Sequence, residues 1–185
     1  MHNPNFQKRF DWEYTKHKEM FNILSKDLSD YLNLDAIQLQ DAPMELDTKK
    51  STDVVAIASK KGERKELYIA ARIRKPNCKY RELTIRKEYY GSSNTEVSKL
   101  HNAHYYFVGF TNMDNEIKEY MIVNIKKLYQ TNLIDKYKSE TKGNKDDDNK
   151  FFGIPAIELI NNNCVVKYKI RKDILLKQIE NLKNK

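Results

Sequence analysis

The segment KKSTDVVAIASKKGERKELYIAARIRKPNCKYRELTIR, from Lys49 to Arg86, decides the fold. It holds an apolar run from Val54 to Ala58 and then a charged turn from Lys60 to Lys65. Residues 67–74 and 82–86 each alternate between apolar and polar or charged side chains. Alternation with a period of two is typical of β-strands. The segment therefore predicts three consecutive strands.

Acidic and basic side chains take defined places on these strands. Asp53 stands at the mouth of the first run. Because successive side chains of a strand point to opposite faces, Arg72 and Arg74 are expected on one face, opposite the apolar residues of their run. Glu82 and Arg86 likewise share a face of the third run. We therefore expect one or two carboxylates and several guanidinium groups around one sheet surface, as a candidate site.

The charge of the chain indicates a polyanionic partner. Its 185 residues predict a single domain, residues 1–185, with a formal charge of +8. Residues 60–90 alone contain eleven Lys or Arg against four Glu. A basic balance on one sheet favours nucleic acid, most simply DNA, although a merely solvated basic face has the same composition. The residues expected to contact nucleic acid are Arg72, Arg74, Lys75, Arg81 and Arg86.

Cysteine use and hydropathy indicate a cytoplasmic location. Cys78 and Cys164 are far apart, have no metal-type spacing and are expected to be reduced thiols. The N-terminal residues are polar and aromatic, unlike a signal peptide. No apolar run approaches the roughly 20 residues of a membrane span.

The rest of the chain predicts helices and further strands around this segment. Asp11 is a plausible N-cap for an amphipathic helix from Trp12 to Leu32. Residues 36–40 alternate weakly, as an edge strand does. The run from His104 to Phe110 is apolar on both faces and predicts a central strand, paired in a hairpin with Lys118 to Ile125.

The C-terminal third predicts a loop, a strand and a helix. Residues 138–150 are polar and of mixed charge, as in a mobile surface loop. Asp146, Asp147 and Asp148 lack the alternating ligands and the glycine of a calcium loop. A strand from Cys164 to Ile170 and an amphipathic helix complete the chain. The order of elements favours an α/β (α+β) fold with a mixed central β-sheet flanked by helices.

This order resembles the core of PD-(D/E)XK nucleases, which implies a restriction-endonuclease-like fold. In that core an acidic residue opens a hairpin, and a Glu-x-Lys on the following strand helps it to hold a divalent metal. Here Ser51-Thr52-Asp53 would occupy the position of the Pro-Asp element, and Ala70-Ala71-Arg72 would occupy that of Glu-x-Lys. The longer pattern over residues 51–110 resembles small bacteriophage and prophage proteins. That likeness implies the cytoplasm of a bacterial host cell and brings no established activity.

The chain departs from the nuclease pattern at two residues. Ala70 cannot bind a metal, and Arg72 cannot act as a base because a guanidinium stays protonated in proteins. An active site would need an acid from elsewhere, for which Glu82 is the first candidate. Asp53 and Glu82 would hold Mg²⁺ or Mn²⁺, and Arg72 would neutralise charge on the phosphate. Further candidate carboxylates are Glu45 and Asp47 and, more distantly, Glu13.

Three functions are compatible with these features. The first is a Mg²⁺-dependent DNA nuclease, a phosphodiesterase of the PD-(D/E)XK type. The second is a nucleic-acid-binding protein that kept the fold and lost the metal site, as Ala70 allows. The third is a phage accessory protein that binds a host or defence protein through its basic and aromatic surface. Substrate structure, sequence preference and oligomeric state have no signal in the sequence.

Overall fold

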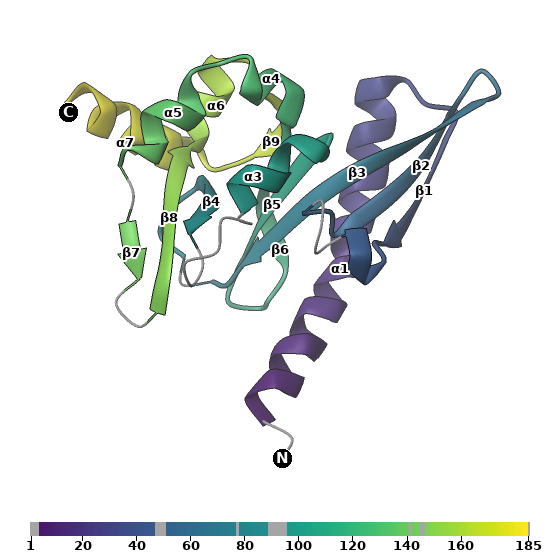
Figure 1. Cartoon of the computed structure of the whole chain (residues 1–185), viewed down its shortest axis with the longest axis horizontal. Helices are drawn as coiled ribbons and strands as arrows, with labels where there is room; N and C mark the ends of the chain where they lie inside the picture. Colours follow the sequence, from purple (N-terminus) through teal and green to yellow (C-terminus); the bar gives the residue numbers. More distant parts are fainter. Residues whose placement is uncertain are drawn as a thin grey trace.

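The computed structural model describes residues 4–46, 51–76, 78–88, 96–140, 142–144 and 147–184, and of residues 4–15, 88, 142–144 and 147–149 it describes the backbone. The architecture is mixed α+β, with a central mixed sheet of six strands flanked by helices (Figure 1). This confirms the predicted class of fold. One face of the large sheet packs on the first helix, and the other packs on a smaller sheet and several short helices.

The first helix, α1 (Pro4–Leu32), ends where the sequence predicted but includes residues well before Trp12. The backbone of Asp11 is helical, so its predicted role as N-cap was wrong. Residues 5–11 contain no glycine, proline or β-branched residue that would interrupt a helix. Met20, Leu24 and Leu28 recur every four residues and are fully buried against the sheet. Burial of each contributes about 1.5–3 kcal/mol.

The large sheet has the strand order β1-β2-β3-β5-β6-β9. All neighbouring pairs are antiparallel except β3 and β5, which are parallel. The first strand lies at the edge and β5 is buried along its whole length, as the sequence predicted. The strands are β1 (Ala36–Asp41), β2 (Val54–Lys60), β3 (Glu63–Arg74), β5 (Tyr105–Thr111), β6 (Ile117–Asn124) and β9 (Val165–Lys169).

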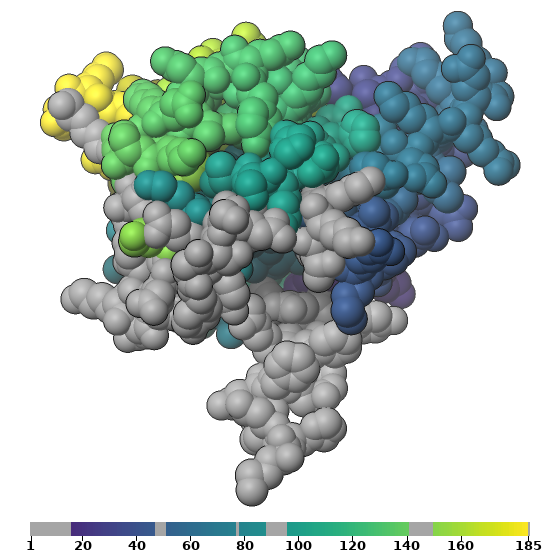
Figure 2. All heavy atoms as spheres, viewed as in Figure 1, coloured from purple at the N-terminus to yellow at the C-terminus, as the bar shows by residue number. Residues whose placement is uncertain are grey.

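The hairpin between β2 and β3 is tighter than the charged turn that the sequence predicted. Lys60 pairs with Glu63, so only Lys61 and Gly62 form the turn. Their φ angles are 51° and 82°, and two positive φ values are the feature of a type I′ turn, which matches the twist of the flanking strands. The charged residues on either side therefore belong to the strands. The hairpin tip projects from the body of the molecule (Figure 2).

The third predicted strand forms, but it does not lie beside β3. This strand, β4 (Glu82–Glu88), pairs with β8 (Asp147–Pro155) in a second sheet, whose third strand is β7 (Lys142–Asn144). The expectation of three strands around one sheet surface was therefore wrong. Pro76 follows β3 and ends the ladder there. Leu83 and Ile85 of β4 are fully buried, and they pack against the large sheet from its second face.

The second sheet also corrects the prediction of a loop over residues 138–150. Within the described residues, this stretch contains β7 and the first half of β8. Phe152 and Ile154 bury β8 against the core, and the strand extends from them into the polar residues 147–150. Backbone pairing with β4 and β7 holds these polar residues in a strand, which apolar content alone does not predict. Asp146 lies outside the described residues.

Short helices connect the strands on the second face of the large sheet. None of the described helices combines the length and the apolar character that crossing a membrane requires. The predicted C-terminal amphipathic helix is confirmed as α7. The helices are α3 (Glu96–Lys99), the 3-10 turn η1 (Leu100–Asn102), α4 (Ile125–Tyr129), α5 (Leu133–Lys138), α6 (Ala156–Asn161) and α7 (Lys172–Lys183).

Two hydrophobic cores lie on the two faces of the large sheet. The core under α1 contains Ile69 of β3 and Phe107 of β5. The core on the other face contains Ala70 and Tyr106, together with buried residues of β4, β8, α4, α5 and α6. Alternation along β3 therefore directs every second side chain into the space between the two sheets. Arg72 and Arg74 belong to this set.

Candidate functional site

Asp53 lies directly before β2, and its carboxylate is fixed against β3. Its backbone N–H donates to the carbonyl oxygen of Ile69 over 3.0 Å. Its Oδ2 accepts a hydrogen bond of 2.6 Å from the backbone N–H of Ala71. These bonds hold Asp53 opposite the middle of β3, where Ala70 and Arg72 stand. The expected position of an acid at the opening of the hairpin is therefore confirmed.

Arg72 and Arg74 leave β3 on the same face as Ala70, and we call these two residues the arginine face. Ile69 is buried in the α1 core, and Ala71 and Ile73 pack against that core, so the predicted alternation is correct. The second sheet, however, lies over this face. The side chain of Arg72 is only 27% exposed, and its Nη1 donates to the carbonyl oxygen of Thr84 in β4.

Glu96, at the start of α3, is the carboxylate that pairs with the arginine face. Arg72 Nη2 donates to Glu96 Oε2 over 3.1 Å, and the backbone N–H of Arg86 donates to the same oxygen over 3.0 Å. The hydroxyl of Tyr106 donates to Glu96 Oε1 over 2.6 Å. One carboxylate thus connects β3, β4 and β5 while its side chain is only 13% exposed.

The electrostatics of this cluster keep its groups in single protonation states. The pKa of Arg72 is raised, first by Tyr106 and then by the carboxylates of Glu96 and Asp53, against an opposing effect of burial. Burial raises the pKa of Tyr106 well above its usual value, and Glu96 and Asp53 add to this effect. The guanidinium therefore stays charged and the phenol stays protonated. Neither group can act as a general base near neutral pH.

Arg74 has a different environment from Arg72. Its pKa is lowered, first by burial and second by the positive charge of Arg72. Among the residues that the structure describes, no carboxylate lies within ion-pair distance of its guanidinium. The carboxylate of Glu82 acts on it from farther away. Arg74 therefore carries a half-buried positive charge beside a second one.

Glu82 lies on β4 and its described contacts are in the second sheet. Its carboxylate passes over Gly153 of β8, where an added Cβ would lie 2.3 Å from the carboxylate carbon. Gly153 therefore leaves the room that this side chain occupies. Asp53 instead contacts β3, and no described contact joins the two carboxylates. Their sharing of one cation stays a prediction.

The other predicted site residues are spread around this region. Residues 44–46 form a helical turn in which Glu45 is exposed, and Ala42 before it donates to the carbonyl oxygen of Asp53. Lys75 is exposed and Arg86 is half-buried beside Glu96. Asp47 and the side chain of Glu13 lie outside what the structure describes.

Arg81 was predicted to contact nucleic acid, and the structure places its side chain inside the fold. Its side chain is 10% exposed, and its Nε donates to Glu119 Oε2 over 2.9 Å. Its guanidinium also stacks on the ring of Phe110, 4.5 Å from the centroid. The prediction rested on the basic composition of residues 60–90, whereas Arg81 precedes β4 and turns inward to a buried carboxylate. Its charge is neutralised inside the fold.

Sequence reasoning missed Glu96 and Tyr106 as members of the site. Glu96 opens the short helix α3, and the sequence analysis did not assign it to the site. Tyr106 pairs with Ala70 across the parallel β3–β5 ladder, so it shares the face of Arg72. Both strands were predicted from the sequence, but their register was not. The register of β3 against β5 places the Tyr106 hydroxyl on the same face as Arg72.

The cluster can bind anions and has a partial set of metal ligands. Among the described residues, no three His, Cys, Asp or Glu side chains gather where they could hold one metal ion. Asp53 and Glu96 are two carboxylates that act on the same guanidinium. Arginines are the residues that bind phosphate oxygens most specifically, through paired N–H groups. Comparisons of the chain with protein-family models, curated proteins and solved structures give no match.

Proposed function

We propose that the protein binds DNA through its arginine face, on a core of the PD-(D/E)XK type. The observation that carries this proposal is the charge of Arg74, which is half-buried, lies two residues from Arg72 and has no ion pair with a described carboxylate. Burying such a charge costs free energy unless an anion approaches it. A phosphate oxygen supplies that anion.

The contrast between the buried arginines supports this assignment. Arg81 and Arg72 each have a carboxylate within about 3 Å, Glu119 and Glu96 respectively, and both contribute to the fold. Arg74 stands at the end of β3, and the exposed residues Lys75 and Lys79 follow it. A phosphate backbone that reaches Arg74 would therefore meet further positive charge.

The order of elements supports the type of core. The N-terminal helix is followed by the β2–β3 hairpin, Asp53 opens that hairpin, and the candidate site lies on its second strand. These are the features expected of a PD-(D/E)XK core. Ala70 and Arg72 in place of the Glu-x-Lys pair favour binding of the phosphate over its hydrolysis.

Hydrolysis of DNA is the second candidate function, and one observation favours it. Asp53 and Glu96 both act electrostatically on the same guanidinium, so Glu96, rather than Glu82, is the second carboxylate that a Mg²⁺ or Mn²⁺ ion would need. The metal would supply an activated water and a positive charge on the phosphate. Glu96 already accepts three hydrogen bonds, from Arg72, Arg86 and Tyr106. A metal would have to replace at least one of them.

One experiment tests both functions. The purified protein is incubated with linear duplex, branched and single-stranded DNA in Mg²⁺, in Mn²⁺ and in EDTA, and both binding and cleavage are measured. Binding that persists in EDTA without cleavage in either metal supports the first function. Cleavage that needs metal, is lost in Asp53→Asn and Glu96→Gln and survives in Glu82→Gln supports the second. The absence of both binding and cleavage contradicts both functions.

A further inference from the structure

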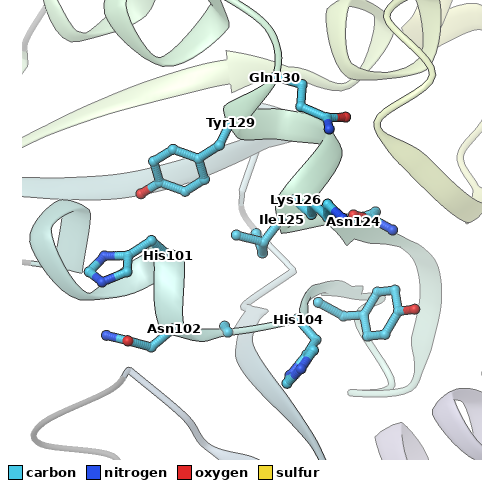
Figure 3. Close-up of a pocket in the computed structure, with 10 residues that line it drawn as sticks. His101, Asn102, His104, Asn124, Ile125, Lys126, Tyr129 and Gln130 are labelled. Atoms are coloured by element: carbon cyan, nitrogen blue, oxygen red, sulfur yellow. The ribbon is translucent and has the colours of Figure 1, made fainter.

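A pocket lies at the end of the large sheet, away from the arginine face. It has a volume of about 550 Å³, within the range of sites that bind small molecules. The walls come from η1, the start of β5, the end of β6 and α4 (Figure 3).

Two of the rings that line this pocket, those of Tyr129 and His101, are exposed. Tyr129 of α4 is 41% exposed, and its hydroxyl donates to the carbonyl oxygen of Val97 over 3.2 Å, which holds the ring in place. His101 of η1 is exposed near Tyr129, and Ile125, which is almost fully buried, lies beside the two rings (Figure 3). Exposed rings beside an aliphatic side chain suit a flat, unsaturated group.

The polar groups that line the pocket indicate the charge and the hydrogen-bonding groups of a ligand that would fit it. The pocket is lined by one lysine and two histidines but by no Asp or Glu, although the chain contains 26 of them. Lys126 places a positive charge at the rim. Asn102 donates its Nδ2 to the carbonyl oxygen of Lys99, which leaves its Oδ1 to accept, and Gln130 adds an exposed amide. The ligand therefore has a hydrogen-bonding edge and a neutral or negative charge.

We propose that this pocket binds one nucleotide. The base stacks on Tyr129, its edge meets the amide of Asn102, and the phosphate lies near Lys126. A free mononucleotide and an unstacked nucleotide of a single strand present the same chemistry. The site is separate from the arginine face, so the proposal goes beyond DNA binding there and does not depend on it.

A structural connection nevertheless exists between the two sites. Tyr129 is bonded to the backbone of Val97, and the neighbouring residue Glu96 holds Arg72. Residues 96–102 of α3 and η1 therefore join the pocket to the arginine face. A single strand held on the arginine face would have a base pocket on the same connecting segment.

Ligand-observed NMR titrations test the proposal. The ligands are adenosine 5′-monophosphate, thymidine 5′-monophosphate and an oligothymidylate of five nucleotides. Tyr129→Ala should weaken binding by roughly 5- to 150-fold, the range found for loss of one base–aromatic stack. The control is Tyr168→Ala on β9, where the exposed fraction of 43% matches that of Tyr129. Lys126→Ala should weaken binding of the monophosphate more than that of adenosine.

The outcomes separate the two sources of the nucleotide. Stronger binding of the oligomer than of the monophosphates supports a single strand, and the reverse order supports a free nucleotide. Adenosine, which carries no phosphate, should also lose affinity in Tyr129→Ala, which distinguishes this pocket from the arginine face. Absence of binding by all three ligands at millimolar concentration overturns the proposal. If Tyr129→Ala does not fold, unchanged affinity in His101→Ala, which removes an exposed ring, overturns it equally.

Discussion

Arg72 on β3 and Glu96 on α3 form an ion pair, with 3.1 Å between Nη2 and Oε2, that fastens the short helix to the large sheet. The same carboxylate accepts hydrogen bonds from the backbone of Arg86 on β4 and from the hydroxyl of Tyr106 on β5. Three strands from two sheets therefore meet at one acidic side chain. Its negative charge also limits how strongly Arg72 can attract a phosphate.

Replacement of Glu96 by Gln tests whether this carboxylate stabilises the fold and whether it weakens the attraction of Arg72 for phosphate. The amide keeps the shape but loses the charge, so the fold should lose about 1–3 kcal/mol from weaker charge-assisted hydrogen bonds. Affinity for DNA should rise, because Arg72 then lacks its neutralising partner. Thermal melting and fluorescence anisotropy measure the two quantities. The control is Glu116→Gln, which alters the exposed pair with Lys118 and should change stability by at most about 1 kcal/mol. Lower affinity for DNA in Glu96→Gln would contradict this account.

Replacement of Arg81 by Ala should destabilise the protein without removing a contact to DNA. The ion pair with Glu119 is about nine-tenths buried, and removal of Arg81 leaves this carboxylate with only the exposed Arg171 near its other oxygen. The expected loss is about 3–5 kcal/mol. Urea unfolding gives this value, and anisotropy below the melting temperature gives the affinity.

The exposed Arg171 provides the control for Arg81. Its side chain is 66% exposed and lies 3.8 Å from the other oxygen of Glu119. Arg171→Ala should therefore cost less than about 1 kcal/mol. Equal stability of the two variants would show that Arg81 is not the buried partner described above.

The stability of the fold should fall as the pH drops below the usual pKa of a histidine, because His104 resists protonation in the folded chain. Burial, and then Lys65, lower the pKa of His104, and its Nδ1 accepts a hydrogen bond from the backbone N–H of Tyr68. A depressed pKa means that the unfolded chain takes up a proton that the folded chain resists. This stabilisation is therefore complete above pH of about 6.5 and is lost as the pH falls through the folded-state value.

The variant His104→Asn isolates this effect, since Asn can accept the same hydrogen bond without titrating. The free energy of unfolding, measured in urea from pH 5 to pH 8, should rise with pH in the wild type more than in the variant. The difference between the two proteins should be constant above pH 7. A wild type that becomes more stable relative to the variant as the pH falls would mean that the sign of the pKa shift is wrong.

The sequence predicted much of the fold because apolar alternation and helical spacing are local signals. The strands β1, β2, β3 and β5, the main helix and the position of Asp53 all follow from them. The pairing of β4 with β8 did not, because it depends on contacts between residues about 70 positions apart. Residues 147–150 are too polar to suggest a strand without that partner.

The candidate site was predictable only in part, for the same reason. The shared face of Arg72 and Arg74 follows from alternation, and the structure agrees. The choice of Glu82 as second carboxylate assumed that β4 neighbours β3, whereas Glu96 on α3 occupies that position beside Arg72. The inward turn of Arg81 depends on Glu119, a partner 38 residues away. Long-range partners of charged residues leave no periodic signal.

The salt dependence of DNA binding by wild type and Arg74→Ala tests the central claim most directly. A phosphate contact releases a counterion, so loss of Arg74 should weaken binding and reduce the slope of log K against log salt by about one. The fold should melt at the same temperature or higher, because a half-buried charge beside Arg72 is removed. Arg171→Ala serves as the control of equal charge. An unchanged affinity and slope in Arg74→Ala, or DNA binding that does not respond to salt, would contradict the assignment of the arginine face to DNA.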